Sequence, residues 1–202
     1  MLDINLLLQK GATYRHAEMG ETIFNEGAHA TFYYQLVSGR VRWSNFGDSG
    51  KEVLHKIVEP GESFGEFPLF DGEPYVASAV ADIPSVILRL SAASFHELLM
   101  ERPDILFAFT KTLVAHLRFK FFLLNALSKN HPHTVLSELI EYFNKQGMLI
   151  CQDCNRLMIT RQQLANMAGL RVETVIRAIK QLQQEDKLSI VKGKVFIPSD
   201  GI

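Results

Sequence analysis

One short stretch, residues 160–184, constrains the fold more than any other part of the sequence. Thr160 stands three residues before Gln163, a spacing typical of a capping box at the start of a helix. Gly169 allows the left-handed backbone with which a helix ends sharply, and a second helix is predicted over 172–184. With the small Ala165 at the crossing point, the stretch predicts a helix-turn-helix. The alternative is a generic helical hairpin with a solvated charged face.

The residues around this helix pair predict a wing and a supporting helix. The apolar segment 188–197 is interrupted by Lys192 and Gly193, which predicts a hairpin that turns at this dipeptide. A further helix is predicted to end near Gly147. Short strands are predicted at 148–151 and 157–159. Together these elements predict a winged helix-turn-helix.

Charge is distributed unevenly along the 202 residues. The chain has 21 Lys+Arg and 22 Asp+Glu, which excludes a generally basic coat for nucleic acid. Residues 156–180 nevertheless carry five basic residues and one acidic residue, whereas residues 1–130 carry 12 and 15. The positive field therefore gathers on the helix pair, as a nucleic-acid-binding face requires.

The first hundred residues contain short apolar segments separated by glycine-containing turns. Such segments at roughly even spacing are typical of an antiparallel barrel or jelly roll. The predicted strands are 22–24, 32–37, 41–43, 53–58, 78–80 and 86–90. The predicted turns between them include 38–39, 47–50, 59–61 and 71–72. With the helical part, this predicts an α+β chain.

A long helix is predicted between these two regions. Asp104 is expected to cap it, and its pattern runs to about Leu127. One apolar stripe recurs at helical spacing and consists of Leu106, Leu113, Leu117, Phe121 and Leu124. Phe107, Val114 and Phe122 lie away from this stripe, so the helix needs two burial partners. A second copy of the helix in a homodimer is favoured over a helix sandwiched inside one domain. The predicted domains are 1–102, 103–130 and 131–202.

The sequence shows no export signal or membrane span, so we expect a protein of the reducing cytoplasm. An enzyme on a jelly-roll barrel is the alternative class, but the sequence argues against it. Residues 1–100 contain no His-x-His pair, and no Gly-x-Ser-x-Gly or phosphate loop occurs. We therefore predict a protein that is not an enzyme.

Four segments carry a resemblance to one family. ETVIR at 173–177 is similar to a recognition core of the CRP/FNR regulators, bacterial transcription factors related to the cyclic-AMP receptor protein. GETIFNEG at 20–27, LVSGRV at 36–41 and GESFGE at 61–66 resemble the family's barrel turns and phosphate-binding cassette, in the family's order. The resemblance implies a cyclic-nucleotide-binding-like barrel, a long dimer helix and a winged helix-turn-helix.

The resemblance also implies which residues would bind double-stranded DNA. Arg177 would bind guanine, and Glu173 would accept from cytosine and orient Arg177. Ile176 would contact a thymine methyl, while Val172 replaces an arginine of the cyclic-AMP receptor and removes a guanine contact. A TGA-like core is expected in each half-site of a palindrome. The residues predicted to hold phosphate are Thr160, Arg161, Gln162, Arg171, Thr174 and Lys192.

The effector pocket departs from the nucleotide-binding pattern. Gly65 and Glu66 match the cassette, and Glu66 would hold a ribose hydroxyl. Tyr75 and Val76 stand where nucleotide-binding members have Arg and Ser, so a cyclic phosphate would lack its fixed cation. The sequence therefore argues against cyclic AMP, and the effector stays unknown. The alternative is that Glu66 caps a turn and Tyr75 fills the pocket.

Other sensing chemistries remain as alternatives. The chain has two cysteines, Cys151 and Cys154, too few for an iron–sulfur cluster of the FNR type. Two thiols in a loop are favoured over a redox-switched disulfide or a zinc site with His131 and His133. No metal site is predicted. The candidates for haem ligation are His16, His29, His55, His96 and His116.

The sequence as a whole predicts a homodimeric regulator controlled by an unidentified signal, with RNA polymerase and a small-molecule effector as further candidate partners and no membrane partner. Activation and repression cannot be distinguished from the residues alone. The alternatives are a ligand- or partner-binding barrel that does not bind DNA, and a redox- or haem-sensing member of the same family.

Overall fold

The computed structural model describes residues 2–48 and 50–198. They divide into two units, of which the first ends at Leu113 and the second begins at Val114. In the first unit the elements are α1 (Ile4–Gln9), β1 (Thr13–Ala17), β2 (Thr22–Phe24), β3 (Phe32–Phe46), β4 (Glu52–Val58), β5 (Ser63–Phe64), α2 (Pro68–Asp71), β6 (Ser78–Ser91) and α3 (Ala92–Glu101). Helix α4 (Pro103–Ser128) begins in the first unit and ends in the second. The second unit continues with α5 (Pro132–Gln146), α6 (Arg161–Ala168), α7 (Val172–Gln184), β7 (Ser189–Val191) and β8 (Lys194–Phe196).

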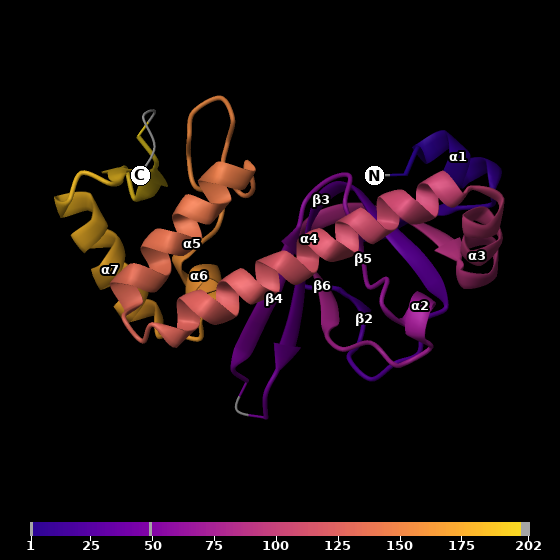
Figure 1. Cartoon of the computed structure of the whole chain (residues 1–202), viewed down its shortest axis with the longest axis horizontal. Coiled ribbons are helices and arrows are strands. Elements are labelled where there is room, and N and C mark those ends of the chain that lie inside the picture. Colours follow the sequence, from indigo (N-terminus) through magenta and orange to yellow (C-terminus); the bar gives the residue numbers. More distant parts are fainter. Residues whose placement is uncertain (1, 49, 199–202) are drawn as a thin grey trace. The chain divides into compact units, whose positions relative to one another are not determined.

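The first unit is built on one antiparallel sheet (Figure 1). The strand order is β1-β6-β3-β4, while β2 also pairs with β6 and β5 with β3. The two long strands β3 and β6 pair from Phe32–Ser91 to Ser44–Ser78 and form the centre of the sheet. The second unit is mainly helical with a two-stranded hairpin. The predicted α+β class is therefore confirmed.

The predicted turn at 38–39 is wrong. Ser38 and Gly39 form an irregularity inside the continuous strand β3, where the pairing with β6 shifts register. Gly39 has a φ of 95°, and a Cβ there would lie 2.3 Å from the Ser85 hydroxyl oxygen. Only glycine fits such a bulge against the partner strand. The segments 78–80 and 86–90 are likewise parts of a single strand, β6.

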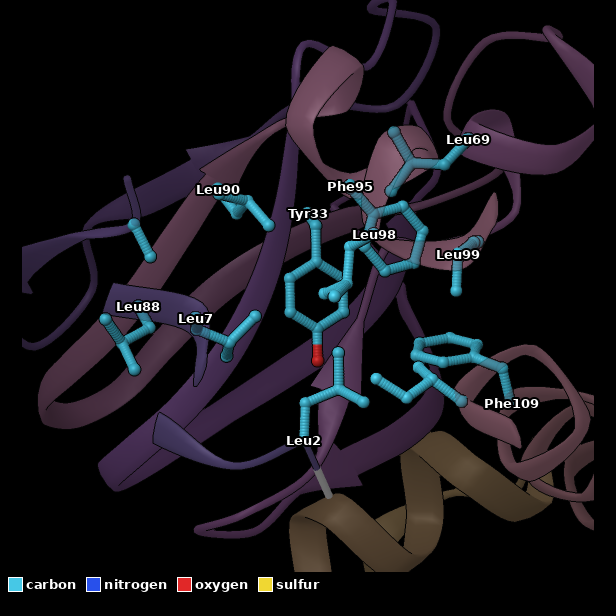
Figure 2. Close-up of a cluster of buried hydrophobic side chains, with 12 residues drawn as sticks. Leu2, Leu7, Tyr33, Leu69, Leu88, Leu90, Phe95, Leu98, Leu99 and Phe109 are labelled. Carbon is cyan, nitrogen blue, oxygen red and sulfur yellow. The ribbon is translucent and has the colours of Figure 1, made fainter. Parts of the chain in front are cut away.

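A cluster of apolar side chains closes one end of this unit (Figure 2). The ring of Tyr33 stacks on that of Phe95 with 4.7 Å between centroids, and Phe109 of α4 meets Phe95 edge-on. The Tyr33 hydroxyl donates to Oε1 of Gln35 at 2.7 Å, and the Gln35 amide donates to the Leu2 carbonyl. The start of the chain is thus tied to β3.

Helices α1 and α3 are additions to the predicted fold. Asp3 caps α1 by accepting from the Leu6 amide, and Ser91 caps α3 by accepting from the Ser94 amide. Both helices pack against the cluster of Figure 2 through side chains such as Leu7. They are only 6 and 10 residues long, so their periodicity is short and weak.

Helix α4 begins two residues earlier than a cap at Asp104 predicts. Pro103 is its first residue, so Asp104 lies in the first turn instead of capping it, and its carboxylate pairs with Arg102 at 2.8 Å. Proline suits this position because its missing amide hydrogen is not needed there. Within residues 2–48 and 50–198, no helix has both the length and the apolar character needed to cross a membrane.

In the second unit, α5 ends at Gly147 as predicted, with a left-handed φ of 64°. The predicted strands at 148–151 and 157–159 are reduced to a single bridge between Ile150 and Leu157. The backbone at Leu149 and Asn155 has positive φ, which interrupts a regular ladder.

Candidate nucleic-acid interface and effector pocket

The predicted helix-turn-helix is present in the second unit. The Thr160 hydroxyl accepts from the Gln163 amide at 3.1 Å, and the Gln163 side chain accepts from the Thr160 amide at 3.0 Å. This reciprocal capping box fixes the first residue of α6. Gly169 ends α6 with a φ of 64°, and Ala165 is fully buried where α6 meets α7. Local chemistry therefore sets both the start of α6 and the turn into α7.

Helix α7 has two distinct faces. Four side chains form its buried face: Val175, Ala178, Ile179 and Leu182. On the other side Glu173 and Arg177 are exposed, and they lie one helical turn apart. Val172 and Ile176 beside them are half-buried. The four residues predicted to read bases therefore lie on or beside the accessible face of one helix.

The residues predicted to hold phosphate lie at the beginnings of α6 and α7 and on the wing. Arg171 precedes α7 without making a side-chain cap, so the first amides of α7 are not covered by a side chain of the described residues. Thr160, Gln162 and Arg171 are exposed, whereas Thr174 is half-buried. The Gln162 side chain also donates to Asn166 at 2.8 Å.

The wing is the hairpin of β7 and β8. Its turn is Lys192 and Gly193, both with left-handed φ values of 48° and 76°, the combination that a tight hairpin prefers. Arg161 of α6 donates to the Gly193 carbonyl at 2.9 Å, so α6 and the wing are linked directly. One nitrogen of the Arg161 guanidinium is thus used in this bond and not available to phosphate. The sequence pattern did not indicate this contact.

The charge of the chain is divided between the two units. Residues 114–202 carry 12 Lys+Arg and seven Asp+Glu, whereas residues 1–113 carry nine and 15. The basic excess therefore belongs to the unit that holds the helix-turn-helix. This is the electrostatic condition for attraction to a phosphate backbone.

Helix α4 exposes an apolar stripe. Of the five predicted dimer-helix residues, Leu113 is half-buried and four are exposed: Leu106, Leu117, Phe121 and Leu124. Phe107 and Val114 beside the stripe are exposed as well. Four other residues of the helix are buried: Ile105, Phe109, Phe119 and Leu123. The stripe is therefore not covered by the described chain.

The centre of the predicted effector pocket is occupied by aromatic rings. Tyr75 is buried and stacks on Phe24 with 3.8 Å between ring centroids and an interplanar angle of 10°. Gly65 lies against this pair with a φ of 70°, and a Cβ there would lie 2.4 Å from the Phe24 ring. Tyr34 and Phe64 complete the cluster. Phe24 was not predicted as a pocket residue, because only its contact with a residue far along the chain reveals it.

Glu66 and Val76 occupy opposite environments in the same region. Glu66 is fully buried, and this burial raises the pKa of its carboxyl above the usual value of 4.5. Burial also raises the pKa of the Tyr75 hydroxyl. The Val76 side chain is 55% exposed, so it points away from the aromatic cluster. In the described residues no group of three metal-ligating side chains comes together, and the zinc alternative gains no support.

Two family descriptions match successive parts of the chain. "Cyclic nucleotide-binding domain" matches residues 14–102, and "Crp-like helix-turn-helix domain" matches residues 134–199. The cAMP-activated global transcriptional regulator CRP of Haemophilus influenzae is 28% identical over 178 residues, which cover 87% of this chain and 79% of that protein.

Solved structures show the same architecture. The catabolite activator protein of Thermus thermophilus is 27% identical, with a TM-score of 0.56 over 96% of this chain and 89% of that one. The c-di-GMP-responsive regulator CLP of Xanthomonas campestris is 18% identical and shares the fold, with a TM-score of 0.74 over 96% and 98% of the two chains. With a cyclic-nucleotide-binding-type domain followed by a Crp-like helix-turn-helix, this chain belongs to the CRP/FNR family of DNA-binding transcription regulators, and not to a family of enzymes.

Proposed function

We propose that this regulator binds a palindromic DNA site as a homodimer in the cytoplasm, and that a signal received by the β domain sets its affinity. The observation that carries the proposal is the accessible face of α7. Glu173 and Arg177 are both exposed there, and neither forms an ion pair with another described residue. Both are therefore available to base edges in a major groove.

The apolar stripe of α4 supports the homodimer. Leu117, Phe121 and Leu124 are 56%, 66% and 66% exposed, which is costly for a helix that stays alone in water. A second copy related by a twofold axis would cover the stripe with its own. The two recognition helices would then face half-sites one DNA turn apart, roughly 34 Å.

The aromatic cluster supports a signal other than cyclic AMP. Relatives differ in their effector, since one is named for cyclic AMP and another for c-di-GMP. In this chain the stacked rings of Tyr75 and Phe24 lie against Gly65, in the segment that resembles the phosphate-binding cassette. A neutral tyrosine also offers no cation to a phosphodiester. We infer that the β domain responds to a signal other than cyclic AMP.

Fluorescence anisotropy on labelled duplexes tests this function. The probe carries two inverted TGA half-sites one turn apart, and matched probes have one or both half-sites scrambled. We expect tight binding by a dimer to the intact palindrome, weaker binding to the single half-site, and no gain on adding cyclic AMP. Equal affinity for all three duplexes would refute sequence-specific binding, and a marked gain with cyclic AMP would refute the assigned pocket.

A further inference from the structure

The two cysteines of the chain lie in one tight turn of the DNA-binding unit. The Cys151 amide donates to the Arg156 carbonyl at 2.9 Å, and the Asn155 amide donates to the Cys151 carbonyl at 2.8 Å. These bonds close the loop of residues 151–156, and Asn155 adopts a φ of 55°. Two residues separate the cysteines, so both belong to this one turn.

The two thiols are accessible. Cys154 is exposed and Cys151 is half-buried, and neither forms a disulfide. A hydrogen bond from the Cys154 side chain, aided by the backbone amides of Asp153 and Cys154, lowers the pKa of the Cys151 thiol. Such bonds stabilise a thiolate, which is the form of cysteine that attacks disulfides. Since the described residues gather no third ligand, the pair is not completed as a metal site.

The turn is bonded to the wing and precedes α6 directly. The Leu157 amide donates to the Val195 carbonyl at 2.9 Å, and the Ile197 amide donates to the Asn155 carbonyl at 3.0 Å. Thr160, which caps α6, follows three residues after Leu157. The turn is therefore linked by hydrogen bonds to β8 and the residue after it, and by the chain to the beginning of the helix-turn-helix.

We propose that Cys151 and Cys154 form a thiol–disulfide exchange site for low-molecular-weight disulfides. The Cys151 thiolate attacks one sulfur of a disulfide RSSR, forms a mixed disulfide and releases one thiolate RS⁻. The Cys154 thiol loses its proton to solvent and attacks the Cys151 sulfur, which releases the second RS⁻. The protein dithiol is oxidised by two electrons, and RSSR is reduced to two RSH after the thiolates take up protons.

The effect of this site on DNA binding rests on the function proposed above. A disulfide across the turn pulls the two cysteines together and disturbs the bonds of Asn155 and Leu157 to the wing strand. We expect the oxidised protein to bind the palindrome about fivefold more weakly or worse, the range typical of coupling between sites. The reduced protein retains full affinity.

Thiol alkylation with mass spectrometry of the full chain in glutathione buffers tests the site. Because the chain has only two cysteines, the readout is unambiguous. Wild type should pass from doubly alkylated to unalkylated as glutathione disulfide increases, without stable adducts or cross-linked dimers. Cys154→Ser should trap a glutathione adduct on Cys151 about tenfold faster than Cys151→Ser traps one on Cys154. Independent alkylation of both thiols, or equal trapping rates, would overturn the site.

DNA anisotropy on the same samples separates this inference from the proposed function. A reduced protein that ignores the palindrome refutes the proposed function but leaves the thiol assay unaffected. A protein that binds the palindrome yet forms no internal disulfide refutes the exchange site. If the disulfide forms without changing affinity, the coupling to the wing is refuted. The variant with both cysteines replaced by serine should bind DNA identically in every buffer.

Discussion

Arg177 is the residue on which sequence-specific reading of DNA most depends. Its guanidinium is exposed on α7 one turn after Glu173, whereas Lys180 is exposed nearby on the same helix without an assigned base contact. Arg177→Ala should cost about 1–3 kcal/mol of binding to the palindrome and relax specificity at one guanine. Anisotropy with the native palindrome and a guanine-substituted duplex measures this, with Lys180→Ala as the control. The same loss on both duplexes for Arg177→Ala would contradict base reading.

Gly65 provides a test of how tightly the pocket region is filled. Gly65 and Gly72 both have left-handed φ values, 70° and 76°, but only Gly65 faces a ring within contact distance of a new Cβ. Gly72→Ala should therefore cost about 1 kcal/mol of unfolding free energy through backbone strain alone. Gly65→Ala should cost about 1–3 kcal/mol more, because it also displaces Phe24 from Tyr75.

Urea unfolding followed by circular dichroism measures both variants. Equal destabilisation would mean that the Phe24 ring moves aside freely, in which case the pocket is not firmly closed. A larger loss of unfolding free energy for Gly65→Ala would support the interpretation that the rings of Phe24 and Tyr75 are firmly packed in the pocket.

At the scale of elements, α4 carries the homodimer prediction. Leu117→Glu places a charge in the middle of the exposed stripe and should shift the protein to monomer, because burying an unpaired carboxylate is costly. Ala115→Glu is the matched control: Ala115 is also exposed, about 160° around the helix from Leu117. Analytical ultracentrifugation distinguishes the two. A dimeric Leu117→Glu protein would contradict the stripe as the interface.

Elements whose ends are set by local chemistry were predictable from the sequence. The capping box at Thr160, the left-handed Gly169 and the Lys192–Gly193 turn each involve residues close together in the sequence, and the structure has all of them. Gly39 shows the opposite case, because a glycine with positive φ serves a turn and a bulge equally well. The choice depends on Ser85, 46 residues away, which closes against Gly39 from β6.

The candidate sites also divide into features set by neighbouring residues and features set by distant ones. The accessible face of α7 was predictable because helical periodicity alone determines which residues share a side. The sequence offered only as an alternative that Tyr75 fills the pocket, and the stacking of Phe24 on Tyr75 was not predictable, since it joins residues far apart in the sequence. The link between Arg161 and the wing was hidden for the same reason, because its acceptor is a backbone carbonyl 32 residues away.

At the scale of the whole molecule, the chain is almost neutral in total, but its positive and negative charges are strongly separated. The unit with the helix-turn-helix has a basic excess and the unit with the sheet has an acidic excess. The acidic unit should be repelled by a phosphate backbone, while the basic unit is attracted. This separation favours encounters with DNA through the α7 face and makes affinity depend on salt.

The wing lysine allows the salt dependence to be assigned to a residue. Lys192→Asn removes one charge per protomer, yet asparagine tolerates the left-handed backbone at this position, where φ is 48°. If Lys192 contacts phosphate in both protomers, the slope of log affinity against log salt should fall by about 2. Lys145→Gln removes an equal charge from an exposed site at the end of α5 and should leave the slope unchanged. Discrimination between the palindrome and a scrambled duplex should stay the same in both variants, since phosphate contacts carry no sequence information. A slope that is equal in wild type and Lys192→Asn would exclude the wing from the DNA interface.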